Sequence, residues 1–168
     1  MRLPFVQWIQ TERLQALYDK HASALLAYAR SLGPDRGSAE ELVQQVFLAL
    51  LEGRKLPAEP RPYLFRAVRN TALNRHRASS RQVPIEEDAP WFAKDGVPGE
   101  SELDLRRALA ALPPEQREVV VMHLWGGLSF EETGRALDIS PNTAASRYRY
   151  ALSALRARLR PQSAETEE

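Results

Sequence analysis

Apolar residues recur at helical spacing in every long segment of this 168-residue chain, and no segment alternates convincingly with the period of two that a half-buried strand requires. The periodicity disappears only over residues 83–101, where three prolines interrupt an acidic stretch, as is typical of a linker. The sequence therefore predicts an all-α chain with two small helical domains joined by a flexible acidic, proline-rich linker. The predicted parts are a first domain (1–82), the linker (83–101), a second, helix-turn-helix domain (102–160) and an acidic disordered tail (161–168).

Local start and stop signals place the individual helices. Ser38–Glu41 and Ser129–Glu132 have the capping-box pattern, in which a serine hydroxyl and a glutamate carboxylate accept hydrogen bonds from two otherwise unpaired amides. Ser101 and Ser140 are predicted N-caps of two further helices. With prolines as starts and glycines as ends, the pattern predicts helices over Thr11–Leu32, from Ser38 to near Gly53, Pro62–Ser79, Glu102–Leu112, Pro114–Leu124, Phe130–Leu137 and Pro141–Arg160.

Several classes of protein are disfavoured by what the sequence lacks. The chain has no cysteine, which excludes disulfides and thiolate metal sites and fits a reducing cytosol. No segment has the spacing of a phosphate-binding loop, a metal-ligand set or a nucleophile elbow. No apolar run approaches the ~18 residues of a membrane span, and the N-terminus lacks the pattern of a signal peptide. We therefore expect no catalysis, no cofactor, no metal and no membrane insertion.

The strongest local signal lies between Ser129 and Arg160. A short capped helix, a three-residue turn and a longer capped helix form the pattern of a helix-turn-helix unit, with Ala136 and Ile139 suited to the tight crossing of the two helices. Residues 141–160 hold five arginines and no acid, a local excess that attracts phosphates although the net charge of the chain is only +1. At about 100° per residue, the inner face of the last helix holds Ala144, Tyr148, Ala151 and Leu155, and the outer face holds Asn142, Ala145, Ser146, Arg149, Tyr150 and Ser153. The outer face predicts DNA binding, and the alternative is an ordinary helical hairpin with a solvated basic face.

The helix after Pro62 is a second basic element, because residues 61–82 hold six arginines and no acid. The rings of Tyr63 and Phe65 are suited to stacking on exposed bases. The alternative is a solvated helix whose aromatic residues lie in the core. One face of this helix gathers Arg66, Arg69, Asn70, Asn74 and Arg77.

The helix predicted from Ser38 has an apolar side and a polar stripe. The apolar side holds Val43, Val46, Phe47 and Leu50, and the stripe holds Glu41, Gln44, Gln45 and Leu48. A polar stripe with one exposed leucine usually reflects plain solvent exposure. The alternative is a face that docks on another protein.

Charge is segregated along the middle of the chain. Seven acids lie within residues 83–104, next to the six arginines of residues 61–82. One hypothesis is that the acidic linker folds back on the basic helices in the free protein and shields them from non-specific DNA, since both would lie within a Debye length of ~8 Å. The alternative is a solvated tether that its own charges keep extended.

Three segments occur in a particular order along the chain. They are AEELVQQVFLALL at Ala39–Leu51, YLFRAVRNTALNRHR at Tyr63–Arg77 and LPPEQREVVVMHLWGGLSFEETGRALDISPNTAASRYRYALSAL at Leu112–Leu155. Together they resemble a bacterial RNA polymerase sigma factor of the small extracytoplasmic-function (ECF) group of the sigma-70 family. The resemblance covers about 14–82 and 103–159, with only the linker between.

The resemblance implies roles for individual positions. Glu41, Gln44 and Gln45 match a stripe that docks on the clamp helices of the largest polymerase subunit. Tyr63, Leu64 and Asn70 match the helix that reads the −10 promoter element, and the loop before it, Gly53–Pro62, matches one that captures a flipped base. Leu112–Arg117 resembles the opening of the C-terminal domain, which binds the flap of the second-largest subunit. Ser140, Thr143, Ser146 and Arg147 match the recognition helix for the −35 element.

Combined with the two basic faces, the resemblance predicts three binding surfaces. Core polymerase is bound by Glu41, Gln44, Gln45 and Leu48. The −10 element is bound by Tyr63, Arg66, Arg69, Asn70, Asn74 and Arg77. The −35 element is bound by Asn142, Thr143, Ser146, Arg147, Arg149 and Tyr150.

The chain departs from the family pattern at several positions. Gln45 stands where an acid is usual, Tyr63 where tryptophan is usual and Asn74 where aspartate is usual. In the recognition helix, Ala144, Ala145 and Tyr150 replace a valine, a basic residue and an arginine. Either Arg149 supplies the missing cation or reading of the −35 element is weak or altered, and the promoter sequence does not follow from these residues.

The resemblance thus implies a sigma factor that binds core RNA polymerase, directs it to specific promoters and aids promoter opening. The expected partners are core RNA polymerase, promoter DNA and an anti-sigma factor, and the expected location is the cytoplasm, on the nucleoid. One alternative is a helix-turn-helix regulator or adaptor that does not engage RNA polymerase. A more distant alternative is an enzyme that acts on nucleic acid.

Overall fold

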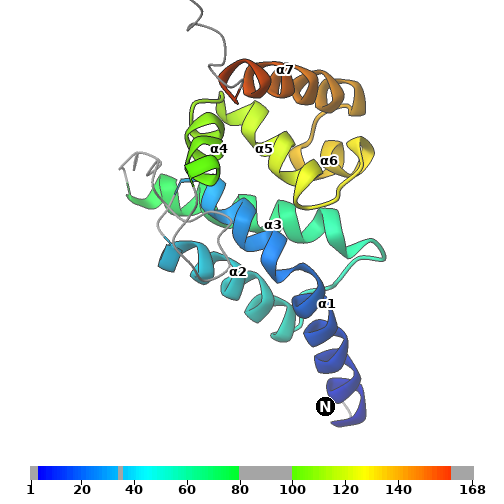
Figure 1. The fold of residues 1–168 in the computed structure, drawn as a ribbon. Coiled ribbons are helices and arrows are strands. Elements are labelled where there is room, and N and C mark those ends of the chain that lie inside the picture. Colours follow the sequence, from blue (N-terminus) through cyan, green and yellow to red (C-terminus); the bar gives the residue numbers. More distant parts are fainter. Residues whose placement is uncertain (1–3, 34–35, 80–99, 160–168) are drawn as a thin grey trace, which may run out of the picture.

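Seven α-helices form the part of the chain that the computed structural model describes, residues 4–33, 36–79 and 100–159, and these residues contain no strand (Figure 1). The all-α prediction is confirmed. The helices are α1 (Pro4–Ser31), α2 (Arg36–Leu51), α3 (Pro60–Ser79), α4 (Glu100–Ala110), α5 (Pro114–Leu124), α6 (Phe130–Leu137) and α7 (Pro141–Leu159).

The last three helices begin where their local signals predict. Pro113 is the N-cap of α5, with Pro114 at the first helical position. Ser129 and Glu132 form both hydrogen bonds of a capping box at the start of α6. The Thr143 amide donates to Ser140 Oγ at 3.0 Å, so Ser140 caps α7. Short-range hydrogen bonds therefore mark the starts of α6 and α7, and a proline at the first helical position marks the start of α5.

The predicted starts of α1, α2 and α4 are wrong. Helix α2 begins at Arg36, so Ser38 lies inside it rather than at its N-cap. Glu41 accepts a hydrogen bond from Arg75 of α3 at 3.0 Å. Ser101 likewise lies inside α4, which begins at Glu100, and α1 begins seven residues before Thr11, at Pro4. A proline suits the first helical turn, because the amide hydrogen it lacks would be unpaired there.

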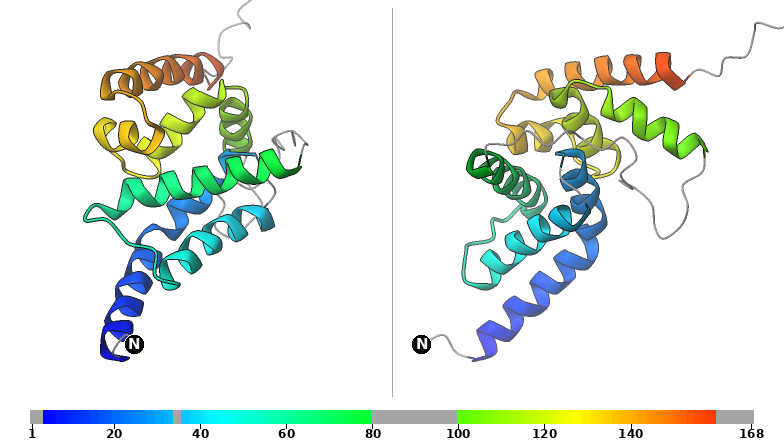
Figure 2. Two further views of the ribbon diagram at one scale, coloured as in Figure 1. Left: turned by 180° about the vertical axis from the view of Figure 1, so that it is seen from behind. Right: turned by 90° about the vertical axis from the view of Figure 1, so that its left-hand side faces the viewer.

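Helices α1–α3 form one group, in which each helix packs against the other two (Figures 1 and 2). Its core is built from Leu25, Leu42, Val43, Leu64 and Val68, all almost fully buried. Helices α4–α7 form a second group, in which α7 lies across α4, α5 and α6. The expectation of two helical units is therefore met.

The two groups also pack against each other, with α3 against α6 and α1 against α5. Buried residues of α5 and of the turn after it, including Met122 and Leu128, belong to the same apolar cluster as Phe65 of α3. Gly126 makes this approach possible: a Cβ atom there would lie 2.8 Å from Cζ of Phe65. The absence of a side chain is what lets this turn reach α3.

None of the described helices is both long enough and apolar enough to cross a membrane. The predicted linker (83–101) lies almost wholly outside the described residues, and so does the predicted tail (161–168). The hypothesis that the acidic linker folds back on the basic helices therefore stays a prediction.

Candidate nucleic-acid and protein interfaces

The helix-turn-helix unit is built from α6, a three-residue turn and α7. Asp138 ends α6 in the left-handed conformation, with φ 57°, and its amide donates to the Gly134 carbonyl. Ala144, Ala151 and Leu155 are buried, as predicted for the inner face of α7. Tyr148 is half-buried and packs edge-on against His123, which stacks on Phe130.

Gly134 is the residue that permits the tight crossing, and sequence reasoning missed it in favour of Ala136 and Ile139. A Cβ atom on Gly134 would lie 2.6 Å from the Ile139 carbonyl oxygen, closer than van der Waals contact allows. A glycine inside an eight-residue helix is the signal that could have identified it, because an interior glycine weakens a helix unless packing requires it.

The outer face of α7 is open to solvent. Asn142, Arg149 and Tyr150 are exposed, and Thr143, Ser146 and Arg147 are half-buried. Arg149 Nη2 donates to Ser146 Oγ at 3.2 Å, so these two side chains lie together on one side of the helix. Helix α7 lies at the end of the molecule opposite α2 (Figures 1 and 2). A polar, basic and exposed helix face of this kind fits the major groove of DNA.

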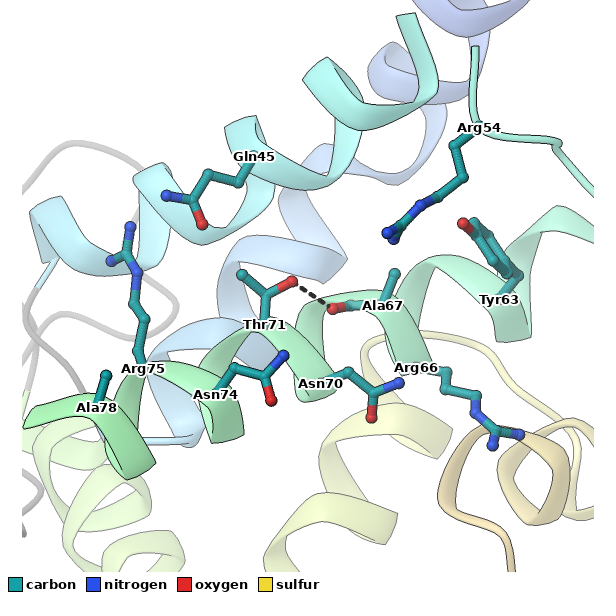
Figure 3. Close-up of a pocket in the computed structure, with 10 residues that line it drawn as sticks. All are labelled: Gln45, Arg54, Tyr63, Arg66, Ala67, Asn70, Thr71, Asn74, Arg75 and Ala78. Atoms are coloured by element: carbon teal, nitrogen blue, oxygen red, sulfur yellow. Dashed lines mark hydrogen bonds between the residues drawn. The ribbon is translucent and has the colours of Figure 1, made fainter. Parts of the chain in front are cut away.

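A cavity of about 740 Å³ opens between α2 and α3 (Figure 3). Four residues of the predicted −10 set line it together: Tyr63, Arg66, Asn70 and Asn74. Gln45, from the predicted docking stripe, lines the opposite wall.

Arg54 and Arg75 also line this cavity, near Tyr63 and near Ala78 respectively, and sequence reasoning placed neither of them there (Figure 3). Arg54 lies in the loop between α2 and α3, and only the packing of these helices brings it over α3. With one ring, three amides and three guanidinium groups, the cavity offers stacking, base-edge hydrogen bonds and phosphate contacts, which are the interactions that hold single-stranded nucleic acid.

Two of the predicted features of α3 differ in the structure. Phe65 is fully buried and packs against Tyr28 with ring centroids 5.4 Å apart, so the expectation that it stacks on bases is wrong. Arg69 does not line the cavity: its Nε donates to Glu118 of α5 at 3.0 Å. Both residues lie at the edge of the polar face, where the neighbouring helix decides the environment. Arg77 is exposed and does not line the cavity.

A second cavity, of about 560 Å³, lies beside the loop before α3. Pro57, Ala58 and Glu59 line one side, and Tyr63 and Arg66 line the other. Arg135 of α6 completes it and forms an ion pair with Glu59 at 2.8 Å. The loop predicted to capture a base therefore does border a cavity, and a residue of the second helical group lies at that cavity.

The predicted docking stripe is exposed along α2. Glu41, Gln44, Gln45 and Leu48 all face solvent, and 55% of the Leu48 side chain is accessible. Leu51 continues the stripe and is also half exposed. On the opposite side, Val43, Val46, Phe47 and Leu50 are buried, as predicted.

Two acids of the second group bind arginines of α3. Glu118 of α5 accepts hydrogen bonds from Arg69 Nε and from the Tyr28 hydroxyl, each at 3.0 Å. Glu132 of α6 accepts from Arg61 Nη2 through both carboxylate oxygens, at 2.9 and 2.7 Å. Beside them, the buried Arg117 side chain donates to the carbonyls of Leu109, Ala110, Leu112 and Ser31.

These contacts shift the pKa values of the groups involved. Burial, and then the Glu118 charge and hydrogen bond, raise the pKa of Tyr28 well above its usual value. Burial alone would raise the pKa of Glu132, but the Ser129 amide and the Arg61 guanidinium outweigh it and lower the pKa below its usual value. Burial lowers the pKa of Arg117. Glu132 is thus held ionised between the amide it caps and the arginine it binds.

The described residues contain no group of three or more histidine, aspartate or glutamate side chains placed to hold a metal ion. The site is thus a set of three open surfaces: the stripe on α2, the cavity beside α3 and the outer face of α7.

Comparison with known proteins matches both helical groups. Residues 17–82 match the family described as Sigma-70 region 2, and residues 102–155 match Sigma-70, region 4. The chain is 33% identical to the ECF RNA polymerase sigma factor SigL of Mycobacterium tuberculosis, over 85% of this chain and 86% of that protein. It is 34% identical to the RNA polymerase sigma-E factor of Streptomyces coelicolor, over 94% of this chain and 86% of that protein.

Solved structures share the fold. The sigma factor RpoE of Bartonella quintana, in complex with the anti-sigma factor NepR, superposes with a TM-score of 0.70 at 23% identity, over 90% of this chain and 99% of that chain. CnrH, in complex with the cytosolic domain of CnrY, superposes with a TM-score of 0.65 at 25% identity, over 91% of both chains. Two family regions in the right order, with relatives above 30% identity that are matched over 86% of their length, show that this chain belongs to the extracytoplasmic-function group of the sigma-70 family of RNA polymerase sigma factors.

Proposed function

We propose that this sigma factor docks on core RNA polymerase through the α2 stripe and reads promoter DNA with α3 and α7. The observation that supports this assignment most directly is that the α2 stripe, the cavity beside α3 and the outer face of α7 are all open to solvent, whereas the fold buries the other side of each helix. As a sigma factor, the chain directs polymerase to promoters, and we propose that it contributes no catalysis of its own.

At the −10 element, the cavity beside α3 would receive the unpaired strand. Tyr63 offers a ring for stacking, and the amides of Asn70 and Asn74 can donate to and accept from base edges. Arg54 and Arg75 would hold phosphates, which position the strand without reading its sequence. Arg66 and the exposed Arg77 extend the basic surface at the two ends.

At the −35 element, the outer face of α7 would enter the major groove. Asn142 is exposed in the first turn of the helix, the part of a recognition helix that contacts base edges, and Arg149 is exposed near the middle of the helix. Ser146, Arg147, Thr143 and Tyr150 complete the predicted contact set. Thr143 Oγ1 lies 2.9 Å from Ser140 Oγ, the N-cap of α7. We therefore expect Thr143 mainly to stabilise the start of this helix.

We also propose that an anti-sigma factor binds this chain. The proposal is supported by the solved structure of RpoE, a protein of the same fold, in complex with NepR. The setting would be the cytoplasm, where polymerase and chromosome meet.

Run-off transcription with purified core polymerase tests the function. The promoters to be used are those of the transcripts that appear when the protein is overproduced. Initiation that needs both core and this chain is the expected result. Binding to these promoters without any core-dependent initiation would support the alternative, a DNA-binding regulator that does not engage polymerase.

The docking stripe has its own test. Gln44→Arg with Leu48→Glu puts two charges into the proposed contact, and we expect a loss of more than about 2 kcal/mol in core binding, the range of an interface hot spot. Gln15→Arg with Leu159→Glu makes the same exchanges at exposed sites on α1 and α7 and serves as the matched control. Unchanged co-purification of the first variant with core would show that the stripe is only solvated surface.

A further inference from the structure

The outer face of α7 carries one side chain that has no polar atom. Five of its six residues bear an amide, a hydroxyl or a guanidinium group, whereas Ala145 bears a single methyl group. Ala145 is the fifth residue of α7, near the N-terminal end of the helix, where a recognition helix contacts base edges. Asn142 and Arg149, both exposed, lie about one turn from it on either side. An apolar group therefore lies between two polar ones on the surface that we assign to DNA.

The packing of α7 decides which of its two adjacent alanines faces outward. Ala144 is fully buried, and so is Ala151, on the side of α7 that packs against the rest of its group. Ala145 is only half-buried and belongs to neither of the two apolar clusters of the described residues, whereas Ala154 of the same helix packs against the second cluster. The fold therefore uses the methyl group of Ala144 in the core and leaves that of Ala145 outside it.

The position of Ala145 relative to Arg149 limits which base pairs the two residues can contact. Arg149 Nη2 donates to Ser146 Oγ at 3.2 Å, and this bond leaves other N–H groups of the guanidinium free for a base edge. Ala145 lies four residues before Arg149, or about 6 Å along the helix axis at ~1.5 Å per residue. Base pairs are stacked ~3.4 Å apart, so the two side chains suit base pairs that are no more than about two steps apart.

We propose that the methyl group of Ala145 reads a thymine of the −35 element through contact with the C5-methyl group of that base. The inference rests on the proposed function of α7. Thymine is the base that presents a methyl group in the major groove, and alanine is one of the side chains that recognise it. The expected −35 element therefore contains a T·A pair within about two steps of the base pair that Arg149 contacts. The alternative is that Ala145 serves the helix alone, because alanine has the highest helix propensity.

The first test removes the methyl group from the DNA. Core polymerase with this chain transcribes a library of templates whose −35 region is randomised, and a transcribed barcode identifies the preferred templates. Each preferred thymine is then replaced by deoxyuridine, which lacks only the C5-methyl group, and the two templates compete for limiting holoenzyme in one run-off reaction. At one position we expect about a fourfold preference for the thymine template, the factor that corresponds to one buried methylene group.

The second test removes the methyl group from the protein. With Ala145→Gly, the thymine and deoxyuridine templates should compete equally at that position. Ala157→Gly is the matched control, because it removes the same methyl group from an exposed position in the last turns of α7, and it should keep the fourfold preference. Glycine weakens a helix at either position. That effect acts on both templates alike and cancels in their ratio.

A third variant keeps the test decisive if Ala145→Gly folds poorly. Lysine is a good helix former and contacts O6 and N7 of guanine, so Ala145→Lys should change the preferred base pair at this position from T·A to G·C. Ala157→Lys adds the same charge near the end of α7 and should leave the preferred sequence unchanged. Circular dichroism checks the helical content of all variants.

Three results would overturn the inference. They are equal competition of the thymine and deoxyuridine templates at every position with the unaltered protein, an unchanged sequence preference in a fully helical Ala145→Lys variant, and a methyl-dependent thymine far from the base pair at which Arg149→Ala relaxes the preference. Each of them leaves core-dependent initiation intact. A failure of the proposed function differs from all three, because the unaltered protein with core polymerase would then initiate from none of the templates.

Discussion

Glu118 lies on α5, yet its carboxylate accepts hydrogen bonds from a hydroxyl on α1 and a guanidinium on α3. Three residues that lie far apart in the sequence thus share one partly buried charge. Arg117, its neighbour in the chain, points the other way and satisfies carbonyls at the end of α4 and at Ser31. Two adjacent charged residues of α5 therefore hold both the second group and its junction with the first.

The Tyr28 hydroxyl gives this contact a pH dependence. Burial and the Glu118 charge raise the pKa of Tyr28, so the folded state favours the neutral phenol. A group whose pKa is raised on folding contributes stability that is fully present below its unfolded pKa of ~10 and is lost as the pH rises through the folded value. We expect an unfolding free energy that falls above pH ~10. Absorbance titration should show a late phenolate step that is missing in Tyr28→Phe, and an identical titration of this variant would contradict the assignment.

Arg149 provides a test of base reading at the level of one side chain. A bidentate contact between arginine and a base edge gives about 1–3 kcal/mol of discrimination. Arg149→Ala should therefore weaken binding to the −35 element by about this amount and relax sequence preference at one position. Arg158→Ala, exposed in the last turn of α7, is the matched control. Equal losses in fluorescence-anisotropy titrations would reduce the role of Arg149 to general charge.

Helix α6 shows how much a short element depends on its ends. Eight residues are too few for a helix to be stable by itself in water. Its start is held by the Ser129–Glu132 capping box, and its end by the left-handed Asp138 and the close approach of Gly134 to Ile139. The first helix of the DNA-binding unit is thus defined by its two boundaries and by packing against α7.

Removal of the cap should destabilise this unit measurably. Ser129→Ala takes away the oxygen that accepts from the Glu132 amide at 3.1 Å. We expect a loss of about 1 kcal/mol in the free energy of unfolding, measured with urea, since that is the typical contribution of a serine N-cap. Ser153→Ala, at an exposed position inside α7, should change stability much less. A comparable effect of both changes would mean that α6 does not depend on its cap.

At the scale of the whole molecule, the contact between the two helical groups at α6 can be locked by a cross-link and released again. Glu59 and Arg135 form an exposed ion pair between the loop before α3 and α6, with side chains 65% and 54% accessible. Exposed pairs contribute little to stability, so Glu59→Cys with Arg135→Cys should fold normally. Cross-linking of the two thiols by a short reducible linker should abolish core-dependent transcription, and reduction should restore it. The same variant without the linker is the control, and full activity of the cross-linked form would show that the groups need not separate.

Features decided within one or two helical turns could be predicted from the sequence. The starts of α5, α6 and α7, the inner face of α7 and the buried side of α2 follow from hydrogen bonds and apolar spacing among near neighbours in the chain. The exposure of the α2 stripe follows for the same reason, because a helix with one apolar side must turn the other side outward. The function was predicted from the three family segments and their order along the chain, because no single surface identifies it.

Only the tertiary structure decided which partner is bound by each residue at the edge of a helix face. Phe65 and Arg69 lie at the edge of the polar face of α3. Tyr28 of α1 and the turn after α5 pack against the first, and Glu118 of α5 binds the second. Glu41 binds Arg75 of α3, and Arg54 lines the cavity between α2 and α3, because the packing of these helices brings the residues together. Periodicity specifies an angle around one helix axis, whereas the contacts of residues at the edge of a face depend on how a second helix packs there. That packing results from burial summed over many distant residues, which no local pattern encodes.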